Sequence, residues 1–175
     1  MRIDDDLYGL AVQVGRAASA RRWLVATAES CTGGLVAGAI TAVAGSSAWF
    51  DRGFVTYSNE AKIEQLGVSL ETLATYGAVS TQTAAAMAAG ALRASRAQWA
   101  VAITGVAGPG GGSIEKPVGM VCFGLASPDG TYTRTHQLWG TRDWVKLLAS
   151  QIALDMVRRA AIGLPAWDPS LFRRR

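Results

Sequence analysis

The chain has few of the residues that build metal sites and disulfide frameworks. Its 175 residues include two cysteines, Cys31 and Cys122, and one histidine, His136. The cysteines lie far apart in the sequence and form no CxxC pair, so neither a disulfide framework nor a zinc site is expected. A single histidine also excludes a His-rich metal site.

Long apolar runs are missing as well. The stretches 24–28 and 100–103 are far shorter than the roughly 18 apolar residues of a membrane span. The first six residues are acidic and contain no apolar core of a signal peptide. We therefore expect a cytoplasmic protein with no membrane partner.

Little net positive charge remains outside the C-terminal end. The formal net charge is +4, and Arg173, Arg174 and Arg175 supply three of these charges. The remaining sequence is close to neutral and shows no basic stripe interleaved with aromatic residues, so no nucleic-acid partner is expected.

We predict one domain over residues 1–164 and a solvated basic tail over 165–175; an anion-binding arm is the alternative for this tail.

Apolar segments alternate with helical patterns along the chain. Strands are expected at 23–28, 53–57, 99–103, 118–126 and 131–139, the last two joined by a Pro-Asp-Gly turn at 128–130. Helices are expected at 7–18, 33–43, 81–97 and 143–162, with one more after a cap at Ser58 or Asn59 and with Ser80 capping the helix at 81. This alternation predicts an α/β domain with a mixed sheet flanked by helices.

A hydroxyl nucleophile is suggested by Ala-Glu-Ser-Cys-Thr-Gly-Gly at 28–34, between a strand end and a helix start. Glycines 33 and 34 permit a tight turn and a close ligand approach, and amide groups at the helix start would face a developing oxyanion. Ser30 is the candidate nucleophile. The simpler alternative is that Ser30 or Thr32 only caps the helix.

A general base is suggested by Lys62 in Tyr-Ser-Asn-Glu-Ala-Lys at 57–62, in the first turn of a helix that also follows a strand. The helix dipole and desolvation would both lower the pKa of this lysine. The chain has only three lysines against fourteen arginines, and an arginine cannot give up its proton in a protein. An ordinary exposed lysine remains the alternative.

A glycine-rich loop follows the strand at 99–103, with five glycines in the nine residues 104–112. Such a loop can point successive amide groups at an anion. It matches neither GxxxxGK[ST] nor GxGxxG, so binding of nucleoside triphosphates or dinucleotides is not supported. A flexible connection is the alternative. If the three strands run parallel, all three motifs lie at their carboxyl ends, where α/β sheets bind ligands.

Taken together, the motifs resemble those of the CinA C-terminal family: AESCTGG at 28–34, YSNEAK at 57–62, GAVS at 77–80 and ITGVAGPGGGSIEKPVG at 103–119. The similarity runs from about residue 10 to residue 164. It implies a three-layer α/β/α sandwich with a mixed, mostly parallel sheet, which commonly forms homo-oligomers. It also implies hydrolysis of nicotinamide mononucleotide to nicotinic acid mononucleotide and ammonia. Longer members of the family carry an N-terminal domain, which this sequence does not contain.

The resemblance also assigns roles to residues. Ser30 is the nucleophile, Lys62 its base and Tyr57 a neighbour in the site, and no metal or organic cofactor is needed. Arg142, just before the last helix, is the candidate for the phosphate of the substrate because its guanidinium can bind an anion through two donors. The remaining expected substrate contacts are Thr32, Gly33, Gly34, Thr104, Gly105, Gly108 and Gly110.

Rival interpretations stay open at this point. A Ser–His–Asp triad would need His136, which falls inside an expected strand, and Cys31 could replace Ser30 as nucleophile. From other functional classes, a non-catalytic nucleotide-binding module and a nucleic-acid-binding competence factor compete with the enzyme. A pure binder needs neither Ser30 nor Lys62.

Overall fold

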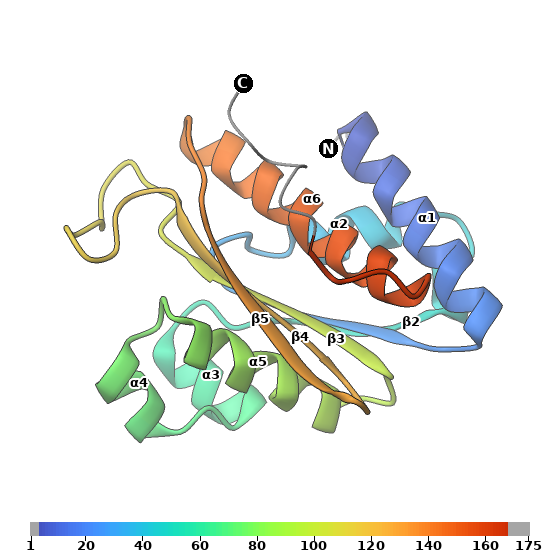
Figure 1. Ribbon diagram of the computed structural model, residues 1–175, viewed down its shortest axis with the longest axis horizontal. Helices are drawn as coiled ribbons and strands as arrows, with labels where there is room; N and C mark the ends of the chain where they lie inside the picture. The colour runs from blue at the N-terminus through green and yellow to red at the C-terminus, as the bar shows by residue number, and fades with distance from the viewer. Residues whose placement is uncertain (1–3, 168–175) are drawn as a thin grey trace.

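The computed structural model describes residues 4–167, which form a five-stranded sheet with helices on both faces (Figure 1). The strands are β1 (Val25–Glu29), β2 (Phe50–Val55), β3 (Trp99–Gly105), β4 (Met120–Ser127) and β5 (Gly130–Gln137). The helices are α1 (Asp5–Arg21), α2 (Leu35–Thr41), α3 (Asn59–Leu66), α4 (Leu70–Tyr76), α5 (Thr81–Arg93) and α6 (Arg142–Ala161), with a short 3-10 turn at Ser46–Ala48.

The strand order across the sheet is β2-β1-β3-β4-β5. Strand β1 pairs in parallel with both β2 and β3, whereas β4 runs antiparallel to β3 and to β5. Only β4 therefore points the other way among the described strands, and the expected mixed, mostly parallel sheet is confirmed. The parallel order of β1, β2 and β3 is the condition on which the convergence of the three motifs depends.

Two helical layers cover the sheet. Figure 1 shows α1, α2 and α6 on one face and α3, α4 and α5 on the other. Because both faces are covered, every residue of the inner strand β1 is buried, and so are the first six residues of the central strand β3. This is the three-layer α/β/α sandwich that the family resemblance implied.

Hydroxyl caps start the helices that surround the carboxyl ends of the parallel strands. The side chain of Ser58 accepts a hydrogen bond from the amide of Ala61 at 3.0 Å, and Ser80 accepts one from Thr83 at 3.1 Å. Both residues were expected as caps from the sequence. Such caps satisfy amide groups that the first helical turn leaves free. They fix where α3 and α5 begin, and α3 carries Lys62.

A close approach of backbones holds α3 against α5. A Cβ placed on Gly90 of α5 would lie 2.0 Å from the carbonyl oxygen of Leu66, the last residue of α3. Only glycine permits this contact without displacing one helix. The position of α3, and therefore of Lys62, depends on it.

The structure differs from the sequence-based expectations in three elements. Helix α5 ends at Arg93, four residues before the expected end at Ala97. Helix α4 was not expected, and none of its side chains is buried. Strand β2 begins at Phe50, three residues before the expected start at Gly53.

The C-terminal end of the described chain packs on the domain. The ring of Trp167 lies 3.9 Å from that of His136 on β5, and the carbonyl of Pro165 accepts a hydrogen bond from Arg159. Residues 165–167 of the expected tail are thus in contact with the folded part. The remaining tail, 168–175, lies outside the described residues. Among the helices of residues 4–167, none has the length and apolar character of a membrane span.

Candidate active site

The three sequence motifs meet at the carboxyl ends of β1, β2 and β3. The amide of Ser30, directly after β1, donates to the carbonyl of Ile103 in β3 at 2.9 Å. On the other side, the amide of Thr56 donates to the carbonyl of Glu29 at 2.8 Å. The sheet therefore holds the Ser30 turn between the segment that leads to Lys62 and the end of β3.

Ser30 and Lys62 form a buried pair. The Nζ atom of Lys62 lies 3.1 Å from the Oγ atom of Ser30, and the two residues are 1% and 8% exposed respectively. The same Nζ contacts three backbone carbonyl oxygens: that of Thr56 at 2.8 Å, that of Ser58 at 3.4 Å and that of Tyr57 at 3.5 Å. No acidic side chain forms an ion pair with Lys62 among the described residues.

Burial lowers the pKa of Lys62 below the ordinary value of 10.5. A charged ammonium is disfavoured where water is excluded, and carbonyl dipoles compensate less than a carboxylate would. A lysine that loses its proton more easily than usual, within reach of a hydroxyl, can act as a general base.

The pair opens into a cavity of about 200 Å³. Six of the residues expected in the site line it, together with four others. The lining residues are Ser30, Cys31, Tyr57, Lys62, Ala78, Val79, Thr104, Gly105, Ala107 and Arg142.

Arg142 connects two of the motifs beside this cavity. Its Nη2 atom donates to the hydroxyl of Tyr57 at 3.0 Å, and its Nη1 atom donates to the carbonyl of Gly108 at 2.8 Å. Thr104 makes a similar link, because its hydroxyl donates to the carbonyl of Ala78 at 2.7 Å. The glycine-rich loop, the segment 77–80 and the start of α3 are thus held around one opening.

Five of the expected substrate contacts do not line the cavity: Thr32, Gly33, Gly34, Gly108 and Gly110. The hydroxyl of Thr32 and the amide of Gly34 donate to the carboxylate of Glu29, at 2.7 and 3.1 Å. The amide of Gly33 donates to the carbonyl of Ser30 at 3.0 Å. Polar groups that the sequence suggested for the substrate are engaged within the protein.

Two charged residues near the site were missed in the sequence. Glu29 is fully buried next to the nucleophile. Lys146 is half-buried on α6, four residues after Arg142, and its Nζ atom lies 3.9 Å from the position that a Cβ on Gly33 would take. Residues four apart share a helix face. That spacing, together with the rarity of lysine in this chain, was the available signal for Lys146.

The rival nucleophile and base are disfavoured by their surroundings. Burial raises the pKa of the Cys31 thiol to about 12, so the reactive thiolate is scarce at neutral pH. His136 packs edge-on against Phe123, and burial lowers the pKa of its imidazole to about 4. Its β5 position faces Val121 across the β4 ladder and not the Ser30 turn.

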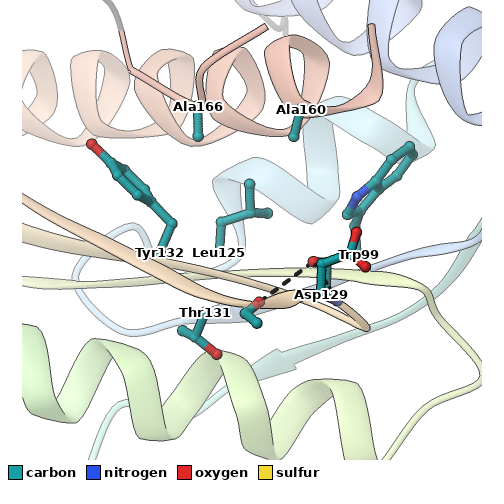
Figure 2. Close-up of a pocket in the computed structure, with 9 residues that line it drawn as sticks. Trp99, Leu125, Asp129, Thr131, Tyr132, Ala160 and Ala166 are labelled. Carbon is teal, nitrogen blue, oxygen red and sulfur yellow. Dashed lines mark hydrogen bonds between the residues drawn. The ribbon is translucent and has the colours of Figure 1, made fainter. Parts of the chain in front are cut away.

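A second, larger cavity of about 350 Å³ lies at the opposite end of the sheet (Figure 2). Trp99, at the start of β3, and Leu125, near the end of β4, line it together with Tyr132 and the hairpin turn. Within residues 4–167, no lysine, histidine or cysteine lines it, so these residues offer no base of the kind that Lys62 provides.

Comparisons with known proteins identify the family of this chain. The family model for the CinA C-terminal domain matches residues 7–161. The chain is 55% identical over 157 residues to the nicotinamide-nucleotide amidohydrolase PncC of Enterobacter agglomerans, covering 89% of this chain and 96% of that protein. It is 57% identical over 153 residues to PncC of Escherichia coli K12, with 87% and 93% covered.

Solved structures of related proteins have the same fold. The competence/damage inducible protein CihA of Agrobacterium tumefaciens superposes with a TM-score of 0.87 at 49% identity, covering 90% of this chain and 96% of that one. A CinA superfamily protein of Klebsiella pneumoniae superposes with a TM-score of 0.86 at 38% identity, covering 89% and 98%. Motifs, fold and relatives lead to one conclusion: the chain belongs to the CinA C-terminal domain family.

Proposed function

We propose that this chain is a nicotinamide-nucleotide amidohydrolase that converts nicotinamide mononucleotide and water to nicotinic acid mononucleotide and ammonia. The observation that carries the proposal is the buried contact between Ser30 Oγ and Lys62 Nζ at 3.1 Å. The relatives named as such amidohydrolases match almost the whole chain at more than half identity.

In the acylation step, neutral Lys62 takes the proton of the Ser30 hydroxyl. A neutral amine has two hydrogens and one lone pair, and the carbonyls of residues 56–58 offer acceptors for the hydrogens. The lone pair is then free for Ser30. The Ser30 oxygen forms a bond to the carboxamide carbon, and the C–N bond breaks as Lys62 returns the proton to the leaving ammonia.

In the deacylation step, water attacks the acyl-enzyme. Lys62 takes a proton from the water and passes it to the departing Ser30 oxygen, which restores both groups. The carbonyl contacts also stabilise the ammonium that forms in each half-reaction, so the base alternates between two states within one fixed geometry.

The phosphate of the substrate has a cationic face to bind. Arg142 lines the cavity, and Lys146 lies one helical turn further along α6, beside the Ser30 turn. Two cations on one helix face suit a phosphate with several acceptor oxygens. We assign the phosphate to this face, with Tyr57 and the Gly108 carbonyl orienting the guanidinium of Arg142.

Three further expectations belong with this proposal: a cytoplasmic location, a homo-oligomeric state and no nucleic-acid partner. The first is the expectation from the sequence, the second rests on the family resemblance and the third on the near-neutral charge outside the tail.

Ammonia release from nicotinamide mononucleotide tests the function. Wild type should release one ammonia for each nicotinic acid mononucleotide formed. The Ser30→Ala variant should lose turnover by several orders of magnitude and still bind the substrate, whereas Cys31→Ala should keep most of the activity.

The alternative outcomes are distinct. If wild type binds the mononucleotide and never releases ammonia, the protein is a binding module. If Cys31→Ala is inactive and Ser30→Ala turns over normally, the thiol is the nucleophile.

A further inference from the structure

Glu29, the residue before the nucleophile, holds its carboxylate in a closed shell of donors. Its Oε2 atom accepts hydrogen bonds from the hydroxyl of Thr32 at 2.7 Å and from the amides of Gly34 and Val36, both at 3.1 Å. Its Oε1 atom accepts one from the amide of Ala37 at 2.8 Å. The residue is 0% exposed.

This shell explains the composition of the turn after β1. Amides at the start of a helix attract an anion, and here the anion is a side chain of the protein itself. The two glycines let the backbone wrap around the carboxylate: Gly33 and Gly34 have φ values of +62° and +95°. The start of α2 is therefore filled and cannot receive a phosphate or an oxyanion of the substrate.

Two amides of the turn are left for other use. The amide of Ser30 donates to Ile103 and that of Gly33 to Ser30 itself. Within residues 4–167, the amides of Cys31 and Thr32 donate to no backbone acceptor of another residue. Both follow the nucleophile directly in the chain. Cys31 lines the cavity, so its amide is available to a carbonyl oxygen attacked by Ser30, whereas Thr32 does not line it.

We propose that Glu29 is a positioning residue of the reaction: its carboxylate fixes the 30–34 turn so that the amide of Cys31 forms the oxyanion hole. This deepens the proposed function and rests on it for the identity of the substrate. Glu29 does not itself touch the substrate, because both carboxylate oxygens are engaged and the residue does not line the cavity.

The Glu29→Gln variant tests the proposal. One carboxamide group cannot accept on both sides, so its NH₂ group must face either the amide of Ala37 or the three donors at the other oxygen. A small displacement of the oxyanion hole should lower kcat by about 10²-fold, whereas KM should stay within about twofold because substrate binding does not use the displaced groups. Thermal unfolding shows whether the variant folds.

Thr32→Val is the second variant and keeps Glu29 itself. It removes one of the four donors and leaves the amides in place, so kcat should fall by a smaller factor with KM unchanged. If Thr32 binds substrate, as the motif suggested, KM rises instead and the proposal is overturned. This variant decides the matter if Glu29→Gln does not fold.

Asp155→Asn is the matched control. Asp155 is also a buried carboxylate, it accepts hydrogen bonds from Arg158 at 2.6 and 2.9 Å, and it lies more than three turns beyond Arg142 on α6. Loss of its charge should change stability and leave kcat unaltered.

A fluorophosphonate probe separates this proposal from the proposed function. The Ser30 oxygen forms a bond to phosphorus, fluoride leaves, Lys62 takes the proton, and the phosphoryl oxygen occupies the oxyanion hole. Labelling of Ser30 should be slower in Glu29→Gln than in wild type. If wild type never hydrolyses the mononucleotide and Glu29→Gln is still labelled more slowly than wild type, the proposed function is contradicted and the role of Glu29 is supported. Labelling and kcat at wild-type values in folded Glu29→Gln would overturn that role.

Discussion

At the scale of a single residue, two opposing effects act on the protonation of Lys62. Its side chain is almost fully buried, which disfavours the ammonium, yet four oxygen atoms surround its Nζ. Carbonyl oxygens accept hydrogen bonds from both the amine and the ammonium form of Lys62, so the site accommodates both protonation states. A carboxylate in the same place would fix the proton on the amine and remove the base.

Replacing Lys62 by arginine should nearly abolish activity. A guanidinium keeps the charge but cannot accept the Ser30 proton. Lys116→Arg is the comparison, because the half-buried Lys116 donates to the carbonyl of Tyr76 and does not line the cavity. It should keep most of kcat/KM, measured as ammonia release. Normal turnover in Lys62→Arg, with loss in Lys116→Arg, would move the base to Lys116.

The dependence of kcat/KM on pH should show an ascending limb that belongs to Lys62. The neutral amine is the active form, so activity rises as pH approaches the pKa of Lys62 from below. Because burial lowers that pKa from 10.5, the limb should lie at lower pH than the titration of a free lysine. A rate that stays flat down to pH 5 would contradict a lysine base.

The same pKa has a consequence for stability. The unfolded chain holds the Lys62 proton up to about pH 10.5, whereas the folded protein releases it earlier. The unfolded state therefore binds more protons between the two pKa values. As pH rises through this window, the free energy of unfolding of wild type should increase relative to that of Lys62→Met. Denaturant unfolding at several pH values measures the difference, and a difference that is constant between pH 7 and 10.5 would refute it.

At the scale of elements, the pattern of apolar residues predicted most of the fold. Strands β1 and β3 are buried on both faces and appear in the sequence as short continuous apolar runs. Helix α4 spans only seven residues and none of its side chains is fully buried, so the helical spacing of Leu70 and Leu73 is too short a pattern to predict it. The start of β2 was missed because Asp51 and Arg52 give this edge strand a polar beginning.

The residues of the site were predictable to different degrees. Ser30 and Lys62 were identified because each follows a strand within a distinctive motif, and Arg142 was identified from the family resemblance. The role of Glu29 depends on where the amides of Val36 and Ala37 point, which only the folded turn determines. In sequence, a glutamate at the end of a buried strand followed by Thr-Gly-Gly could equally face a ligand.

Gly90→Ala tests how α5 positions the helix that carries Lys62. The added methyl would collide with the carbonyl oxygen of Leu66, a backbone atom that cannot yield without moving α3. We expect a loss of about 1–3 kcal/mol in the free energy of unfolding, together with a lower kcat. Gly9→Ala on α1 has no atom within 4 Å and should stabilise by about 0.4–1 kcal/mol. Equal stability of the two variants would show that the close approach has no importance.

At the scale of the whole molecule, the three lysines gather around one end of the sheet although the fourteen arginines are spread over the chain. Lys62 contacts Ser30, Lys146 lies beside Gly33, and Lys116 holds the carbonyl of Tyr76 next to the segment 77–80. The lysines thus add positive charge at the end of the sheet where we propose that a phosphorylated substrate enters.

His136 should govern part of the acid sensitivity of the fold. Its pKa is about 4 in the folded protein against 6.5 for a free imidazole. Between these two values the unfolded chain binds a proton at His136 and the folded chain does not. Stability should fall as pH decreases from about 6.5 to 4. In His136→Gln this part of the dependence should disappear, and Tm measured across that range is the readout. An unchanged pH profile in the variant would rule His136 out as the cause.

Trapping of the acyl-enzyme by hydroxylamine tests the central claim most directly. If Ser30 attacks the carboxamide with Lys62 as its base, the intermediate partitions between water and hydroxylamine. Wild type should then form the hydroxamate of the mononucleotide in proportion to hydroxylamine concentration while ammonia is still released. Ser30→Ala should form neither hydroxamate nor acid. Formation of the acid alone at every hydroxylamine concentration, with Ser30→Ala as active as wild type, would contradict the account.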